Sequence, residues 1–217
     1  MKKVLVYGAG MLGSQIAHLV DEHFSETHEI IGFIDDVRSR GELVLEKYKV
    51  LGGLDAVRMD KQYRPEIATM AFAIGYTNMS ARLEAYHRAQ KHGYGFESFV
   101  HPAASVDSSA IIGSGVVVLA QSVVDQFVTL GDVCYLHNGT IIGENCMIGS
   151  NNYFSAGSTL GGSIEIGHSN FFGMNVTVVD GLSIQNNNFF NAASLVYRDV
   201  MSDLRIVEFR EQREVAK

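Results

Sequence analysis

A glycine-rich turn near the N-terminus is the first feature of this chain that could bind a ligand. Residues 8–13 read GAGMLG and fit the pattern G-x-G-x-x-G. The turn follows an apolar run, Lys3 to Tyr7, that predicts a buried parallel strand, and it opens a helical pattern that continues to Val20. Glycines let the backbone turn tightly and approach a phosphate, and a helix N-terminus offers unpaired N–H groups. We therefore expect a ligand site at Gly8 and Gly10.

Two carboxylates follow the next predicted strand. Residues 29–34 form an apolar run that ends in Asp35 and Asp36, which are placed where a ribose or sugar hydroxyl could be bound. A third predicted strand, Ile67 to Ile74, ends in Gly75 and is followed by a helical pattern over residues 80–91. Because the carboxyl ends of parallel strands meet at one edge of a sheet, these elements predict a small doubly wound α/β domain with its ligand site at that edge.

Other interpretations of this segment stay open. The motif also fits NAD binding, but the segment is shorter than a six-stranded dinucleotide fold, and nothing after it is typical of a hydride-transfer domain. One nucleotide-sized ligand fits better. The glycine-rich turn could also serve only to pack a helix on a strand, and Asp35 and Asp36 could be solvated charges at a strand end.

The second half of the chain carries an apolar residue at every sixth position. Sixteen consecutive hexads follow this rule, from Val106 to Val196. A period of six matches neither the 3.6 of a helix nor the 2 of a simple strand, so the chain must return a side chain to a common axis at each corner of a coil. Three hexads make one triangular coil, and stacked coils pair their backbones. The pattern predicts a parallel β-helix with an aliphatic ladder inside.

Two further columns accompany the ladder. The position after each ladder residue is mostly Gly, Asp or Asn, which we attribute to corners with positive φ. The position two residues before each ladder residue is mostly small or β-branched. It includes the two cysteines, Cys134 and Cys146, so we expect buried thiols and neither a disulfide nor a zinc site.

Composition excludes several classes of partner. The 217 residues carry a formal net charge of −7 with no block of Lys or Arg, which argues against a nucleic-acid surface. No apolar stretch has the length of a membrane span, and the N-terminal apolar run breaks at Gly8, too early for a signal peptide. We expect a cytoplasmic protein with no membrane insertion and no metal.

The order of short motifs resembles a known family. Residues 7–10 (YGAG), 32–36 (GFIDD) and 99–104 (FVHPAA), followed by hexads, resemble the sialic acid O-acetyltransferase family, which includes bacterial nucleotide-sugar N-acetyltransferases. The likeness extends from about residue 3 to residue 200. It implies a Rossmann-like α/β domain over residues 1–100, a left-handed parallel β-helix (hexapeptide-repeat solenoid) over residues 101–200, and a cap or tail over residues 201–217.

The resemblance also implies a homotrimer and two substrates. Acetyl-CoA would bind along the outside of the β-helix between neighbouring subunits, and the N-terminal domain would hold a nucleotide-linked amino sugar. By this resemblance, the acceptor site is lined by Gly8, Gly10, Asp35, Asp36 and Gly75.

The sequence departs from the family at its catalytic histidine. The family's His position is occupied by Glu144, and a second family His corresponds to Tyr153. A sugar amine is nucleophilic once neutral, whereas a hydroxyl needs strong assistance, so the loss of both imidazoles favours an amine acceptor. Glu144 is the predicted base, with a pKa raised if it is buried between subunits. His137 is the alternative base, although its corner position equally fits a residue that tolerates positive φ.

The acetyl-CoA site is predicted on the β-helix. Gly173 and Met174, and likewise Ala193 and Ser194, match positions where the family packs the pantetheine arm and adenine. Asp180 lies two coils beyond Glu144 on the same face, and Gly162 between them would offer the cosubstrate little bulk. His168 is expected to be a surface residue.

Three functions follow from these observations. The leading hypothesis is acetyl-CoA-dependent N-acetylation of a nucleotide-linked amino-dideoxy sugar for surface polysaccharide, such as lipopolysaccharide O-antigen. The first alternative is O-acetylation of a sugar or sialic acid with His137 as the base. The second is a non-catalytic trimer that binds a nucleotide sugar.

Overall fold

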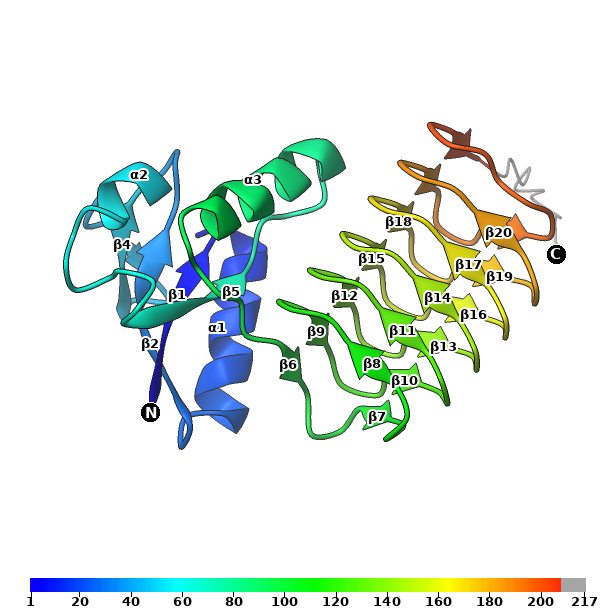
Figure 1. The fold of residues 1–217 in the computed structure, drawn as a ribbon, viewed down its shortest axis with the longest axis horizontal. Coiled ribbons are helices and arrows are strands. Elements are labelled where there is room, and N and C mark those ends of the chain that lie inside the picture. Colours follow the sequence, from blue (N-terminus) through cyan, green and yellow to red (C-terminus); the bar gives the residue numbers. More distant parts are fainter. Residues whose placement is uncertain (208–217) are drawn as a thin grey trace, which may run out of the picture.

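The computed structural model describes residues 1–207. An α/β domain and a β-solenoid lie side by side along the long axis of the molecule, with the C-terminal coils farthest from the α/β domain (Figure 1). Within the described residues, no helix has the length and apolar character needed to cross a lipid bilayer.

The α/β domain is built on a five-stranded mixed sheet in the order β3-β4-β2-β1-β5. Strands β4, β2, β1 and β5 pair in parallel, and β3 pairs with β4 as an antiparallel hairpin at the edge. The expected α/β domain is therefore present, although its sheet is mixed. The strands are β1 (Lys2–Tyr7), β2 (His28–Ile34), β3 (Leu43–Val44), β4 (Tyr48–Gly52) and β5 (Ala68–Phe72).

Three helices cover the two faces of this sheet. Helix α1 (Met11–His23) buries Ile16 and Val20 in one cluster with Phe33 of the sheet. Helices α2 (Leu54–Val57) and α3 (Met79–Lys91) contribute to a second cluster on the other face. The strands and helices expected around residues 3–34 and 67–91 are confirmed to within a few residues. The hairpin β3–β4 and helix α2 were not anticipated, because both are short.

The solenoid consists of three parallel sheets, in which strand residues pair with the residue eighteen positions later, except in the last coil, where the offset is sixteen. The domain-facing sheet contains β6 (Phe99–Val100), β9 (Val117–Val118), β12 (Tyr135–Leu136), β15 (Tyr153–Phe154), β18 (Phe171–Phe172), β21 (Phe189–Phe190) and β23 (Arg205–Ile206). The second sheet contains β7 (Ser105–Val106), β10 (Val123–Val124), β13 (Ile141–Ile142), β16 (Thr159–Leu160), β19 (Thr177–Val178) and β22 (Leu195–Val196). The third sheet contains β8 (Ile111–Ile112), β11 (Thr129–Leu130), β14 (Met147–Ile148), β17 (Glu165–Ile166) and β20 (Ser183–Ile184).

The apolar ladder fills the inside of the solenoid, as predicted. Phe154, Phe172 and Phe190 are fully buried, and their rings stack at centroid distances of 4.7 and 4.6 Å. Cys134 and Cys146 are buried free thiols, and burial raises the pKa of both. The parallel β-solenoid of the left-handed, hexapeptide type is thus confirmed.

The explanation given for the glycine column is wrong. Gly113, Gly131 and Gly143 do not have positive φ; from residue 115 to residue 193, the left-handed residues lie two positions later in each corner, for example Gly115 and Asn145. A Cβ on Gly113 or Gly143 would instead lie 2.7 Å from backbone of the next coil. These glycines are required because successive coils approach closely there.

The C-terminal segment adds one further strand. Strand β23 pairs with β21 and extends the domain-facing sheet. The predicted cap or tail over residues 201–217 lies partly outside the described residues, from 208 onward.

Candidate active site

A cavity of about 810 Å³ lies between the α/β domain and the domain-facing sheet of the solenoid. The α/β domain contributes the glycine-rich turn, Asp35 and the loop after β5, which includes Gly75. The solenoid contributes His137, Gly173 and Met174 among others. The structure thus brings seven sequence-predicted site residues to one cavity: Gly8, Gly10, Asp35, Gly75, His137, Gly173 and Met174.

The glycines around the cavity have two different roles. Gly8 has φ +116°, and a Cβ there would lie 2.4 Å from the carbonyl oxygen of Ala73, so the fold itself requires this glycine. Apart from the adjacent residues in the chain, no atom of the protein lies within 4 Å of a Cβ built on Gly10 or Gly75. Since no other segment of the protein crowds these two positions, both leave open space for a ligand.

The two aspartates after β2 differ in their surroundings. The carboxylate of Asp35 accepts hydrogen bonds from the backbone N–H groups of Ala9, Val37 and Arg38, each at 2.9 Å. Burial raises the pKa of Asp35, but these donors outweigh it and hold the pKa below its usual value. Asp35 therefore stays ionised while it fastens the glycine-rich turn to β2.

Asp36 does not line the cavity. Its carboxylate accepts a hydrogen bond of 3.0 Å from the N–H of Leu54 at the start of α2, and it forms an ion pair with Arg88 of α3. Arg88 also donates a hydrogen bond of 2.7 Å to the hydroxyl of Tyr7. The carboxylate of Asp36 thus links α2 to α3, and its predicted contact with the acceptor remains a prediction.

A row of four aromatic rings follows the solenoid, and three of them, Tyr153, Phe171 and Phe189, form the solenoid wall of the cavity. Tyr135, Tyr153, Phe171 and Phe189 stack along the outside of the domain-facing sheet, with centroid distances of 4.8, 5.6 and 4.6 Å. Burial raises the pKa of Tyr153 to about 12, so its phenol stays neutral near pH 7. This wall was not predicted, although the sequence signals it: aromatic residues stand just before the ladder position once every eighteen residues.

One aromatic ring approaches from the α/β domain. Tyr76, in the loop between β5 and α3, lies 4.7 Å from the ring of Tyr153 and stacks on Phe171 at 4.6 Å. The ring of Tyr76 therefore closes one side of the cavity by packing on the solenoid.

A buried arginine holds the two walls together. Arg82 of α3 is 1% exposed, and its Nε donates a hydrogen bond to the carbonyl of Ile74 at 2.9 Å. Its Nη1 donates to two acceptors of the solenoid, the carbonyl of Val133 at 2.8 Å and the side-chain oxygen of Asn151. Burial lowers the pKa of Arg82 to about 10, so the guanidinium stays charged near neutral pH.

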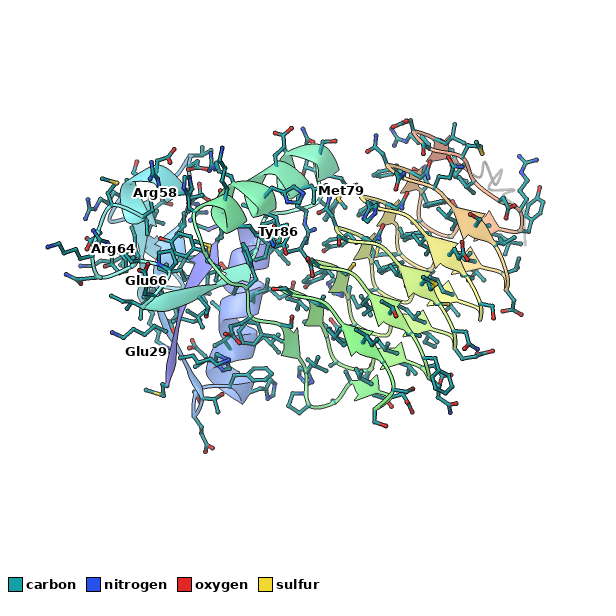
Figure 2. All side chains as sticks on the ribbon, viewed as in Figure 1. Glu29, Arg58, Arg64, Glu66, Met79 and Tyr86 are labelled. Carbon is teal, nitrogen blue, oxygen red and sulfur yellow. The ribbon has the colours of Figure 1, made fainter. Side chains whose placement is uncertain are left out.

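A second contact between α3 and the solenoid lies nearby. The hydroxyl of Tyr86, labelled in Figure 2, donates to Asp132 at 2.9 Å. These contacts fix the loop after β5 against the solenoid.

His137 is half-buried at the corner between the domain-facing and second sheets. Its Nδ1 accepts a hydrogen bond of 2.8 Å from the backbone N–H of Asn138. Burial lowers the pKa of His137, which favours the neutral imidazole. His137 does not have positive φ, so the suggestion that it serves a left-handed corner is wrong.

Glu144 lies at a different corner, between the second and third sheets. It is exposed and does not line the cavity of its own chain. Its carboxylate covers Gly162, and Asp180 accepts a hydrogen bond of 2.9 Å from the N–H of Gly162. The expectation of open space above Gly162 is therefore wrong: this glycine is buried between two carboxylates. The catalytic role of Glu144 and the cosubstrate roles of Gly162 and Asp180 stay predictions.

Three further residues were predicted to contact acetyl-CoA: Met174, Ala193 and Ser194. They lie on the same edge of the solenoid as His137, two to three coils farther along the chain. Met174 is 58% exposed at the cavity, and Ala193 is exposed beyond it. Ser194 is buried, and its hydroxyl donates to the carbonyl of Asn191 at 2.8 Å. Ser194 therefore shapes the corner from inside the solenoid, and its contact with acetyl-CoA is untested.

Few charges reach the cavity. Asp35 and Arg205 are the charged side chains among the described residues that line it. Arg58, Arg64 and Glu66 lie at the end of the α/β domain that points away from the solenoid (Figure 2). The part of the chain that the structure describes holds no group of three or more His, Cys, Asp or Glu side chains arranged for a metal ion. The cavity is thus largely apolar, with a small number of polar groups at its ends, as is typical of small-molecule sites.

Both the solenoid sequence and the whole fold are similar to known proteins. Residues 127–162 match the family described as bacterial transferase hexapeptide (six repeats). No curated protein sequence matches the chain significantly. Among solved structures, the acetyltransferase domain of PglB from Neisseria gonorrhoeae FA1090 is 26% identical with a TM-score of 0.81, over 93% of this chain and 94% of that domain.

Two further structures share the fold. PerB from Caulobacter crescentus, solved in complex with CoA and GDP-perosamine, has a TM-score of 0.83 at 22% identity, over 94% of this chain and 93% of its own. WeeI from Acinetobacter baumannii AYE has a TM-score of 0.51 at 18% identity, over 96% and 97%. The resemblance to hexapeptide-repeat acetyltransferases is thus confirmed, and it covers the α/β domain as well as the solenoid.

Proposed function

We propose that this protein transfers the acetyl group of acetyl-CoA to the amino group of a nucleotide-linked amino-dideoxy sugar, in the synthesis of a surface polysaccharide. The observation that carries the proposal is the cavity itself. It places the glycine-rich turn and Asp35 opposite His137, Gly173 and an aromatic wall, in a fold shared over 93% of the chain with an acetyltransferase domain. The PglB domain has been solved with acetyl coenzyme A, and PerB with CoA and GDP-perosamine, which supports both substrate classes.

The cavity suits a nucleotide sugar. Its 810 Å³ falls within the range of small-molecule sites, and Gly10 and Gly75 leave room for close approach of the ligand. Helix α1 begins within the glycine-rich turn and has no side-chain cap, so no capping side chain occupies the N–H groups of its first turn. In this proposal the α/β domain, over residues 1–100, holds the nucleotide, and the solenoid wall holds the sugar.

The chemistry requires a nucleophile and a proton acceptor. The neutral amine attacks the thioester carbonyl, the C–N bond forms, the C–S bond breaks, and the sulfur leaves as CoA. The amine nitrogen loses one proton in this process, and the thiolate of CoA gains one. Glu144 is the proposed acceptor of the amine proton.

The proposed role of Glu144 requires a second copy of the chain. Glu144 lies at the corner between the second and third sheets, whereas the cavity lies against the domain-facing sheet. We therefore place the Glu144 carboxylate in the cavity of a neighbouring subunit, with acetyl-CoA in the groove between solenoids. The homotrimeric state and the cytoplasmic location belong to this proposal.

The direct test supplies purified protein with acetyl-CoA and a panel of UDP-, dTDP- and GDP-linked amino sugars. We expect release of free thiol with one acceptor and mass-spectrometric detection of that acceptor with one added acetyl group. Binding of a nucleotide sugar with no thiol release from any acceptor would instead support a non-catalytic binding protein.

The base is tested separately. Glu144→Gln keeps the size of the side chain and removes its basicity, and turnover should fall about 10²-fold or more. Glu165→Gln, a matched change on the exposed outer face of the third sheet, should leave turnover unchanged. Equal activity of Glu144→Gln and the unsubstituted protein would remove Glu144 from the mechanism.

A further inference from the structure

The imidazole of His137 is held in one orientation by its own backbone. The N–H of Asn138 can only donate, so Nδ1 of His137, 2.8 Å away, must accept with its lone pair. In a neutral imidazole the other nitrogen then carries the proton. The hydrogen bond therefore selects the tautomer in which Nε2 bears hydrogen.

The side of the solenoid that carries His137 faces the cavity. His137 lines the cavity beside Ser155 and Gly173, and no hydrogen bond from the described residues engages Nε2. The ring of Tyr135 packs near the imidazole at a centroid distance of 6.0 Å in an edge-to-face arrangement. Nε2–H is thus a hydrogen-bond donor without a partner among residues 1–207, on a residue that lines the cavity.

From this geometry we infer that His137 donates a hydrogen bond from Nε2 to an oxygen atom of a bound substrate and does not act as the general base. The inference rests on the proposed function. A base at Nε2 would need the proton on Nδ1, which would then point at the N–H of Asn138 across 2.8 Å. That tautomer would give up the hydrogen bond and bring two hydrogens together. A donor role needs no rearrangement.

Two oxygen atoms could receive the bond, and they predict different kinetics. A bond to the thioester carbonyl oxygen strengthens as negative charge develops, so its loss lowers kcat. A bond to a sugar oxygen is made equally before and during reaction, so its loss raises KM for the acceptor. Either result identifies a donor that contacts substrate.

Among residues 1–207, no charged group offsets the effect of burial on the pKa of His137. Burial alone lowers its pKa. The other titratable and charged side chains that line the cavity or pack on the ring are Asp35, Tyr76, Tyr135, Tyr153 and Arg205. The neutral donor is therefore the form present across the neutral range.

The first test reads the tautomer without any assay of function. Long-range ¹H–¹⁵N NMR of the full chain labelled at histidine, with His137 assigned by its loss in His137→Gln, should show Nδ1 unprotonated and Nε2 protonated at pH 7. His168 is an internal reference, because its Nδ1 accepts from the N–H of Ser150 at 2.9 Å in the same way. An Nδ1–H tautomer or a charged ring at His137 would overturn the inference.

The second test separates a donor from a base. His137→Gln keeps an N–H donor at similar reach and has no basic nitrogen, whereas His137→Ala has neither. We expect His137→Ala to lose about 10²-fold in kcat/KM, as is typical when one such donor is removed, and His137→Gln to recover at least about tenfold of that loss. His137→Gln should also keep the acidic limb of the pH profile, and His168→Gln should match the unsubstituted protein. Equal losses in His137→Gln and His137→Ala would identify a base and refute the donor role.

The two tests fail independently. If no nucleotide amino sugar is acetylated, the proposed function fails, and the NMR measurement still decides the tautomer. If acetyl transfer is found and His137→Gln is as inactive as His137→Ala, only the inference fails.

Discussion

The ring of Tyr76 stacks on the ring of Phe171 with their centroids 4.6 Å apart and an interplanar angle of 27°. Tyr76 belongs to the α/β domain and Phe171 to strand β18 of the solenoid, so the contact joins the two units across the cavity. The cavity wall thus depends on both parts of the chain.

Removal of this ring should weaken acceptor binding. Tyr76 is 45% exposed, so Tyr76→Ala should cost little stability but open the cavity to water. We expect KM for the acceptor to rise about tenfold, equivalent to about 1.4 kcal/mol of binding, with kcat changed less. Tyr76→Phe keeps the stacked ring and should behave as the unsubstituted protein. An unchanged KM in Tyr76→Ala would show that the ring does not contact substrate.

The glycines of the cavity allow a matched pair of substitutions. Gly75→Ala meets no atom within 4 Å and should leave the melting temperature unchanged, while its methyl group enters the ligand space and raises KM for the acceptor about tenfold. Gly8→Ala meets the carbonyl oxygen of Ala73 at 2.4 Å with φ +116° and should cost about 1–3 kcal/mol of stability. Thermal unfolding and steady-state kinetics measure the two effects. A destabilised Gly75→Ala with unchanged KM would contradict this assignment.

Asp35 should make stability depend on pH in the acidic range. Because its folded-state pKa is lowered, the carboxylate stabilises the fold above its unfolded pKa of about 3.9, and this contribution is lost as the pH falls through the lower folded value. Both carboxylate oxygens of Asp35 accept hydrogen bonds from backbone N–H groups. In Asp35→Asn, an amide N–H₂ replaces one of these acceptors and faces a backbone donor, so the melting temperature at pH 7 should fall. The difference from the unsubstituted protein should shrink below about pH 4.

Glu22→Gln, on the exposed side of α1, removes the same charge and serves as the control for Asp35→Asn. It should change the melting temperature little at any pH. A constant difference between Asp35→Asn and the unsubstituted protein from pH 7 to pH 3 would show that the carboxylate charge of Asp35 does not stabilise the turn.

Substitutions at two positions of the solenoid corners should change stability in opposite directions. One position is a glycine packed against the next coil, and the other is a residue with positive φ. A Cβ on Gly113 would lie 2.7 Å from the backbone of Gly131, so Gly113→Ala should destabilise by about 1–3 kcal/mol. Gln121 has φ +62°, which is unfavourable for a residue with a side chain, so Gln121→Gly should leave the melting temperature unchanged or raise it. The reverse order of stabilities would restore the explanation of the glycine column by positive φ.

The solenoid could be predicted from sequence because each coil repeats the same local requirement. One side chain per hexad fills the axis, so the ladder from Val106 to Val196 is visible without knowledge of distant contacts. The close approach of coils at Gly113 is a contact eighteen residues away, which explains why the reason for that glycine was missed. The hairpin β3–β4 carries exposed apolar residues such as Leu43 and Leu45 and gives no clear period.

Strand order predicted the α/β side of the cavity, whereas Gly173 and Met174 on the solenoid side were predicted only through the family resemblance. Gly8, Asp35 and Gly75 follow parallel strands, and the carboxyl ends of such strands share one edge. Arg82 could not be predicted to join the walls, because two of its acceptors are backbone carbonyls and the third, Asn151, lies 69 residues away. The opposition of His137 to the glycine-rich turn likewise arises from how the α/β domain packs on the solenoid.

Acetyl transfer to an amine is tested with two acceptors that differ in one group. A nucleotide-linked amino sugar and the same nucleotide sugar with a hydroxyl in place of the amine are each incubated with acetyl-CoA, and the products are identified by mass spectrometry. We expect an acetyl group on the amine alone, with a lower initial rate in Gly75→Ala at acceptor concentrations below KM. Transfer to the hydroxyl compound, or equal initial rates in Gly75→Ala and the unsubstituted protein, would contradict the proposed function.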